Sequence, residues 1–220
     1  MAAGAPRLLD GPRLAPRHGR ATALVVLLHG YGANGDDLIA LAEGWQARLP
    51  AAAFVAPNAP ETIPGMPGAL QWFALTFRDP DELWRGVVAA EPHLNRFLDR
   101  ELARLELGAE RLALVGFSQG TMLALHVALR RSRQPAAVVG YSGLLAGPEH
   151  IGAITGRPPI LLVHGEDDDL IPVEAMHVAR EQLAAAGLKL EWHVRPGLGH
   201  GIDATGQWLA GHFLAGILKM

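Results

Sequence analysis

The chain has no cysteine, only three serines and only two lysines among its 220 residues. Without cysteine it can form neither a disulfide bond nor a thiolate nucleophile, which suits a reducing compartment. The other 17 basic residues are arginines, and 22 acidic residues bring the formal net charge to −3. Because no long run carries one sign of charge, the sequence predicts no binding to nucleic acid.

Long apolar runs are missing as well. No stretch approaches the roughly 18 apolar residues that a membrane span needs, and residues 1–20 lack the apolar segment of a secretory signal. We therefore expect a cytoplasmic protein with no membrane span. In residues 1–20 four arginines are interleaved with proline and glycine, which predicts a flexible, solvated arm.

Apolar residues are abundant, at 50 % of the chain, and this is enough to bury one complete core. The sequence has no internal repeat and no Ser/Gly linker, so residues 21–220 are predicted to form a single catalytic domain.

Continuous apolar segments alternate with helical patterns along this domain. The predicted strands occupy residues 23–28, 52–56, 112–115, 137–141, 160–163 and 190–194, and the predicted helices occupy 37–48, 92–107, 119–131, 173–186 and 205–218. Continuous apolar runs are typical of strands that are covered on both faces, so the pattern predicts an α/β fold with a mostly parallel sheet flanked by helices. Pro92 is expected in the first turn of its helix, with Gly108 and Gly187 as left-handed helix caps.

One segment does not fit this alternation. Residues 57–77 combine several prolines and glycines with Met66, Leu70, Trp72 and Phe73. A loop this long in a compact domain is usually a lid or a binding loop, so we expect this segment to act as one.

The most informative motif is G-F-S-Q-G at residues 116–120, between an apolar run and a helical pattern. A serine in such a strand-to-helix turn is a nucleophile elbow, and its flanking glycines leave room for the neighbouring strand and helix. Ser142 also follows an apolar run but lacks the spacing. The motif predicts that Ser118 is an exposed nucleophile.

A serine hydroxyl needs a base and an acid to act at neutral pH. Of ten histidines, His200 stands out because glycines flank it in a loop after the last predicted strand. The acid that orients this base is expected among the four carboxylates of residues 166–169, which follow a buried strand. Spacing alone does not choose among the four.

An acyl transfer site also needs two backbone N–H donors for the oxyanion. One is expected from Gln119, which follows the serine, and the other from Tyr31 in the glycine-rich residues 28–35. That segment lacks the G-K-[ST] ending of a phosphate loop, and no pair of histidines has metal-ligand spacing. We therefore expect no cofactor and no metal.

Four motifs together resemble the phospholipase/carboxylesterase family of α/β-hydrolases. They are L-H-G-Y-G at 28–32, G-F-S-Q-G at 116–120, the H-G-x-x-D-x-x-x-P pattern at 164–172 and G-H-G at 199–201. The resemblance covers nearly the whole chain from residue 21 to 218 and implies an α/β-hydrolase fold with no large cap domain. It also implies Ser118 as nucleophile, Asp168 as acid and His200 as base, with the Tyr31 and Gln119 amides as the oxyanion hole.

The same resemblance places Trp72 and Phe73 near the acyl or leaving-group pocket, and we assign Leu170 to substrate contact as well. Tyr31 and the residues after it look closer to the bacterial esterase branch than to the eukaryotic thioesterase branch.

We therefore predict a serine carboxylesterase that cleaves carboxylic or thiol esters of short to medium acyl chains, with a small-molecule substrate and a possible homodimer. The alternatives are an acyl-protein thioesterase or lysophospholipase-like enzyme, another acyl hydrolase or transferase, and a catalytically silent binding module.

Overall fold

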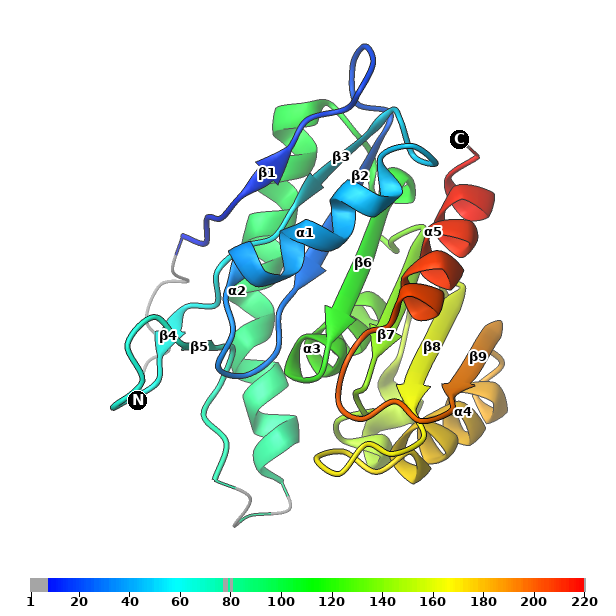
Figure 1. Ribbon diagram of the computed structural model, residues 1–220. Coiled ribbons are helices and arrows are strands. Elements are labelled where there is room, and N and C mark those ends of the chain that lie inside the picture. The colour runs from blue at the N-terminus through cyan, green and yellow to red at the C-terminus, as the bar shows by residue number, and fades with distance from the viewer. Residues whose placement is uncertain (1–7, 77–78, 80, 220) are drawn as a thin grey trace.

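The computed structural model describes residues 8–76, 79 and 81–219, in which helices cover both faces of a seven-stranded sheet (Figure 1). The strand order is β1-β3-β2-β6-β7-β8-β9, with β1 antiparallel to β3 and every other neighbouring pair parallel. The strands are β1 (Arg13–Leu14), β2 (Ala23–Leu28), β3 (Ala52–Val55), β6 (Leu112–Phe117), β7 (Ala137–Tyr141), β8 (Ile160–Gly165) and β9 (Leu190–Arg195). The predicted mostly parallel sheet is therefore confirmed.

Both faces of the central strands are buried, which explains their continuous apolar sequences. In β2, alternate residues enter two separate clusters: Leu24, Val26 and Leu28 face one, and Ala23, Val25 and Leu27 face the other. Successive side chains of a strand point to opposite faces, so a strand between two helical layers is apolar at every position.

Helices α1 (Gly35–Trp45) and α5 (Ala204–Leu218) cover one face of the sheet. Helices α2 (Glu82–Leu105), α3 (Gln119–Arg130) and α4 (Glu174–Ala185) cover the other, as Figure 1 shows. Two short 3₁₀ helices, η1 (Ala109–Arg111) and η2 (Pro148–Ala153), precede β6 and follow β7. None of the helices in the described residues is long and apolar enough to span a bilayer.

The N-terminal segment differs from the predicted flexible arm over its described part. Strand β1 pairs with β3, and Leu9 is buried in the core with 3 % of its surface exposed. The Arg13 guanidinium lies 2.7 Å from the buried Glu101 carboxylate of α2, which also pairs with Arg104. Residues 8–17 are therefore part of the domain, while residues 1–7 lie outside the described residues.

Helix α2 begins ten residues earlier than predicted, so Pro92 lies inside it rather than in its first turn. Pro92 is exposed on the solvent side, and its missing N–H removes one helical hydrogen bond. The apolar face of this 24-residue helix, which includes Val87, Leu94 and Phe97, packs on the core and offsets that loss.

The left-handed residue that ends α2 is Glu106 and not the predicted Gly108. Glu106 adopts φ 57° at the end of the helix, whereas Gly108 has φ −82° and begins η1. The prediction is confirmed for Gly187, which has φ 81° after α4.

The predicted loop at residues 57–77 contains a small hairpin, β4 (Glu61–Thr62) paired with β5 (Leu70–Gln71). In the described part of this segment there is no separate cap domain, as expected. This segment is bound to the loop that follows β2 at Leu70. The Leu70 amide donates to the Ala33 carbonyl, and the Leu70 carbonyl accepts from the Gly32 amide.

The buried N-terminal segment generates a stability prediction. We expect Leu9→Ala to lower the free energy of unfolding by about 2–4 kcal/mol, because it removes a buried side chain and leaves a cavity. The neighbouring Leu8 is 68 % exposed. Leu8→Ala is therefore a matched control that should change the free energy of unfolding by less than about 0.5 kcal/mol. Urea denaturation of both variants measures the difference. Equal, small losses would mean that residues 8–14 do not pack on the domain.

Candidate active site

Ser118 occupies the sharp turn between β6 and α3, as predicted. Its backbone is in an unusual conformation for a residue with a side chain, with φ 53° and ψ −116°. The two glycines of the motif make this turn possible: a Cβ on Gly116 would lie 2.4 Å from the Gly120 carbonyl oxygen, and one on Gly120 would lie 2.0 Å from the Leu28 carbonyl oxygen. Such strain persists only where the surroundings enforce it, and it lies at the expected nucleophile.

His200 and Asp168 are brought together from loops that follow different strands. The His200 Nδ1 atom donates to Asp168 Oδ2 over 2.8 Å. The His200 loop lies directly on the end of β8, because a Cβ on Gly165 would be 2.2 Å from the Leu198 carbonyl oxygen. With Nδ1 holding its proton toward Asp168, the Nε2 atom of His200 is free to accept one.

Asp168 differs from its three acidic neighbours in burial and in partners. It is 5 % exposed, whereas Glu166, Asp167 and Asp169 are exposed. Its Oδ1 atom accepts from the backbone amides of Leu170 at 3.0 Å and Ile171 at 2.9 Å. Burial by itself would raise the pKa of Asp168, but the hydrogen bonds from the Ile171 amide and His200 outweigh it, so this pKa is lowered and the carboxylate stays charged.

A second histidine, His164, also contacts Asp168 and was not identified as a site residue from the sequence. It is 1 % exposed at the end of β8, with Nε2 2.7 Å from the Ile171 carbonyl oxygen and 3.2 Å from Asp168 Oδ2. Burial lowers the pKa of His164, which favours its neutral form. The H-G-x-x-D motif contains both His164 and Asp168. The spacing of the motif does not show, however, that the imidazole of the first residue contacts the carboxylate of the second.

The two predicted oxyanion donors, Tyr31 and Gln119, both line the cavity that holds Ser118 and His200. Within the described residues neither backbone N–H has a hydrogen-bond partner. Gln119 is the first residue of α3, where the helix dipole favours negative charge. The arrangement can therefore stabilise an oxyanion beside Ser118.

The cavity beside Ser118 has a volume of about 690 Å³ and is mostly apolar. Its apolar lining comes from several elements and consists of Tyr31, Leu75, Leu83, Phe117, Met122, Leu144, Leu170, Ile171, Pro172 and Ala175. Leu170, predicted to contact substrate, lies at this cavity and is 71 % exposed.

Trp72 and Phe73, which were expected near the acyl or leaving-group pocket, are not among the residues that line this cavity. Both are buried, at 2 % and 4 % exposure, behind the nucleophile turn. The Gln119 side chain joins them: its Oε1 accepts from the Trp72 amide over 2.9 Å, and its Nε2 donates to the Phe73 carbonyl over 2.8 Å. They therefore support the turn through the Gln119 side chain, a role that the resemblance to the family did not distinguish from substrate contact.

His29 links this support to the other oxyanion segment. The indole Nε1 of Trp72 donates to the His29 carbonyl over 2.9 Å. The His29 ring donates from Nδ1 to the Gly30 carbonyl over 2.8 Å and accepts at Nε2 from the Ala59 amide over 3.0 Å. Burial lowers the pKa of His29, and protonation would leave the Ala59 amide without its acceptor.

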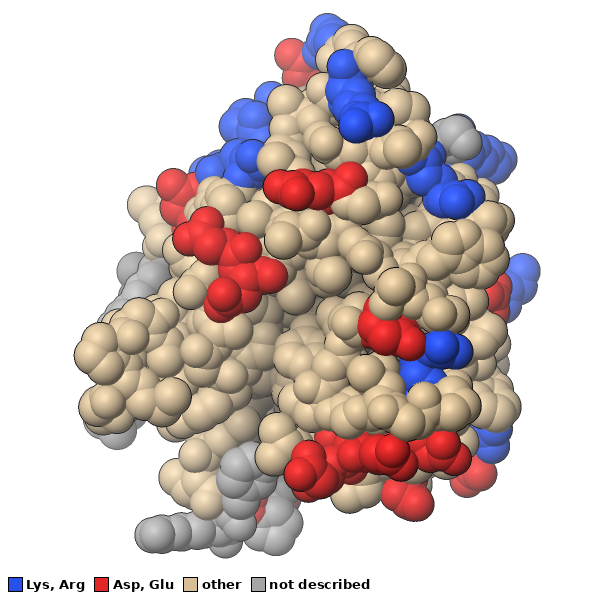
Figure 2. All heavy atoms as spheres, viewed as in Figure 1, with Lys and Arg blue, Asp and Glu red and all other residues tan. Residues whose placement is uncertain are grey.

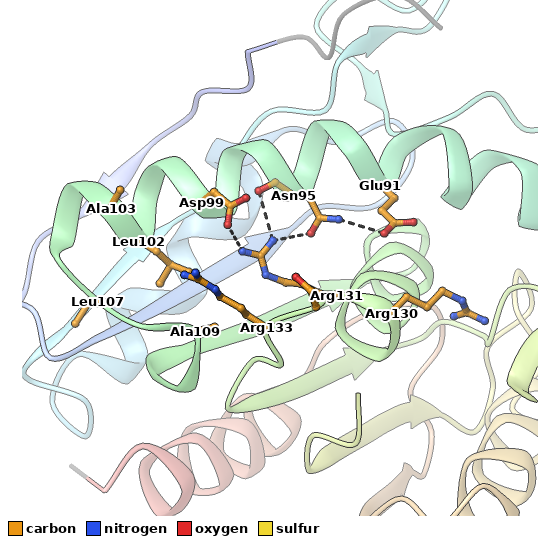
Figure 3. Close-up of a pocket in the computed structure, with 11 residues that line it drawn as sticks. Glu91, Asn95, Asp99, Leu102, Ala103, Leu107, Ala109, Arg130, Arg131 and Arg133 are labelled. Carbon is orange, nitrogen blue, oxygen red and sulfur yellow. Dashed lines mark hydrogen bonds and ion pairs between the residues drawn. The ribbon is translucent and has the colours of Figure 1, made fainter. Parts of the chain in front are cut away.

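A second cavity, of about 600 Å³, lies between α2 and the residues that follow α3 (Figure 3). One of its three arginines is neutralised by a carboxylate: Arg131 contacts Asp99, and it also donates to Asn95 Oδ1 over 2.6 Å. It shares no lining residue with the cavity at Ser118. Among the described residues no three His, Asp or Glu side chains converge as metal ligands.

Comparisons with known proteins agree with this geometry. A family model described as phospholipase/carboxylesterase matches residues 9–217. Acyl-protein thioesterase 1 of Gibberella zeae is 27 % identical over 86 % of this chain and 88 % of that protein, and esterase YpfH of Escherichia coli is 30 % identical over 83 % and 78 %. The crystal structure of esterase PE8 is 40 % identical, covers 96 % of this chain and 100 % of its own, and superposes with a TM-score of 0.92.

The buried histidines generate a pH prediction. Because the pKa values of His29 and His164 are lowered in the folded state, the unfolded chain binds more protons below about pH 6.5, the ordinary histidine pKa. Above that pH we expect these two histidines to make the free energy of unfolding no more dependent on pH. As the pH is lowered below it, the free energy of unfolding should decrease by up to about 1.4 kcal/mol per pH unit for each histidine. Urea titrations between pH 5 and 8 measure it.

His29→Gln removes one titrating group and should make this dependence shallower. The exposed His212 provides the control, since His212→Gln should leave the slope unchanged. An identical slope in the wild type and His29→Gln would contradict the prediction.

Proposed function

The chain belongs to the phospholipase/carboxylesterase family, and we propose that it is a serine hydrolase that cleaves carboxylic esters or thioesters of short to medium acyl chains through an acyl-enzyme on Ser118. The observation that carries the proposal is the strained serine and the Asp168-bound His200 on one apolar cavity. The names of its relatives, an esterase and acyl-protein thioesterases, support the same chemistry.

In the proposed reaction, Ser118 Oγ attacks the carbonyl carbon of the ester while His200 Nε2 takes the hydroxyl proton. The charge on the carbonyl oxygen is stabilised by the amides of Tyr31 and Gln119. The bond to the leaving group then breaks, and His200 gives its proton to the departing alcohol or thiol. Water repeats the sequence on the acyl-enzyme, which releases the acid and restores Ser118.

Asp168 has a positioning and electrostatic part in this proposal. It keeps the proton of His200 on Nδ1 and stabilises the imidazolium that forms during attack. Its lowered pKa supports this role, because the carboxylate stays ionised at the pH where His200 must be neutral to act as a base.

A thioester of an acylated protein is the second candidate substrate, favoured by the acyl-protein thioesterases among the relatives. Both candidates use the same acyl chemistry and differ in the leaving group. Matched ester, thioester and amide substrates separate them, and amide turnover comparable to ester turnover would contradict the esterase proposal.

The triad proposal predicts a graded loss of activity on p-nitrophenyl butyrate. Ser118→Ala and His200→Ala should each lower kcat by about 10³-fold or more. Asp168→Asn should cost far more than Asp167→Asn or Asp169→Asn, which serve as matched controls in the same loop. If either control were as damaging as Asp168→Asn in a folded protein, the assignment of the acid would be wrong.

The apolar cavity predicts the acyl-chain preference. Leu83 lines the cavity from α2, and we expect Leu83→Trp to fill part of it and shift the optimum of a p-nitrophenyl ester series toward shorter chains. Val88, which is 42 % exposed on the same helix, supplies the control Val88→Trp, with an unchanged optimum. An unchanged optimum in Leu83→Trp would mean that the acyl chain binds elsewhere.

A further inference from the structure

Basic residues collect at the edge of the sheet opposite to Ser118. The six parallel strands all start at this edge, and a basic residue lies within four positions before each of them. These residues are Arg20, Arg48, Arg111, Arg133, Arg157 and Lys189. Because parallel strands share one direction, these basic residues lie at one edge although they are far apart in the sequence. One of them, Arg20, is paired there with Glu106 over 2.6 Å.

Acidic residues collect at the other edge, where the strands end and Ser118 lies. Asp36 and Asp37 follow β2 in the first turn of α1, and Glu166, Asp167 and Asp169 follow β8. In Figure 2 most blue groups lie toward the end where the strands begin. Red groups are spread over this view and form a band at the lower edge, where Figure 1 places the loop from β8 to α4.

The charged groups at the cavity beside Ser118 are also acidic rather than basic. None of the described residues that line it is a lysine or an arginine, and its only carboxylate is that of Asp169. The side chains of Glu166, Asp167 and Asp169 are exposed and have no ion-pair partner among the described residues. By contrast, the nearby Arg195 is neutralised by Asp203, 3.0 Å away. Among the described residues, unpaired negative charge therefore lies at the cavity in Asp169 and just before it in the same loop, in Glu166 and Asp167.

We propose that this enzyme acts on esters and thioesters whose leaving groups are uncharged or cationic, and that it discriminates against polyanionic leaving groups such as coenzyme A. The inference rests on the proposed hydrolase function and adds a substrate class to it. An apolar acyl chain fits the cavity, while the leaving group remains near this acidic loop. A polyanion there meets repulsion, and none of the described residues that line the cavity is a lysine or arginine that could bind its phosphates.

Three thioesters with the same acyl group test the charge of the leaving group directly. They are S-butyryl-N-acetylcysteamine, which is uncharged, butyrylthiocholine, which is cationic, and butyryl-coenzyme A, which is polyanionic. Thiol release can be followed with a disulfide reagent, because the chain has no cysteine of its own to react. At low salt we expect kcat/KM for the coenzyme A thioester to be at least about tenfold below that of the uncharged thioester.

Salt separates charge from size. Raising the ionic strength from about 0.01 M to about 0.5 M should narrow the gap between these two substrates, because screening weakens the repulsion. It should lower the rate for butyrylthiocholine relative to the uncharged thioester. A gap that does not change with salt would reflect the bulk of coenzyme A and would overturn the proposal.

Two double variants then locate the effect. Glu166→Gln/Asp167→Asn removes two unpaired charges from the loop that reaches the cavity at Asp169. At low salt it should raise the ratio of kcat/KM for the coenzyme A thioester to kcat/KM for the uncharged thioester by about twofold or more. Glu43→Gln/Glu110→Gln removes the same charge from exposed positions late in α1 and just before β6, so its ratio should stay at the wild-type value. Comparing ratios within each protein cancels differences in folded fraction.

The other possible results test the charge selection and the hydrolase function separately. Equal or faster turnover of the coenzyme A thioester at low salt, or equal changes of ratio in both double variants, would overturn the charge selection while leaving the hydrolase function intact. Failure of the folded protein to cleave any of the three thioesters and p-nitrophenyl butyrate would refute the hydrolase function itself, and this inference with it.

Discussion

The close approach of three backbones around Ser118 is the constraint on which the site depends. The first turn of α3 rests against the ends of β2 and β6, so that Gly116 and Gly120 have no room for a Cβ. This contact holds Ser118 at a positive φ and leaves the Gln119 amide at the start of a helix, beside the serine hydroxyl. The His200 loop uses the same device, since it lies on Gly165 at the end of β8. Backbone contacts of this kind fix positions more tightly than flexible side chains can.

Behind the turn, a buried polar network joins the two segments that contain the proposed oxyanion donors. Gln119 supplies its backbone amide to the cavity and its side chain to the 72–73 segment, while Trp72 reaches the carbonyl of His29. Each of these groups is satisfied, so the network adds rigidity without the cost of an unpaired polar atom. The aromatic pair thus contributes to the site through position rather than through contact with the cavity.

The distribution of charge follows from the same topology. A net charge of −3 suggests an almost neutral molecule, yet the parallel sheet sorts the charges by whether they precede or follow a strand. The basic residues before the parallel strands and the acidic residues that follow β2 and β8 produce an electrical asymmetry along the strand direction, with the negative end on the side of Ser118. The electric field at the site therefore depends on the fold and cannot be read from the composition.

Short-range patterns in the sequence determined the sheet type, five of the helices in outline and the elbow at Ser118, because apolar periodicity and glycine spacing act over a few residues. Long-range packing decided the rest. The N-terminal segment looked solvated until β3 and Glu101 were seen to bind it, and Pro92 looked like a helix start although the core holds a helix around it. Spacing also left four carboxylates equivalent. Only the folded chain, in which His200 meets Asp168 across 32 positions of sequence, distinguishes one of them, since a hydrogen bond depends on where two side chains lie in space and not on their separation along the chain.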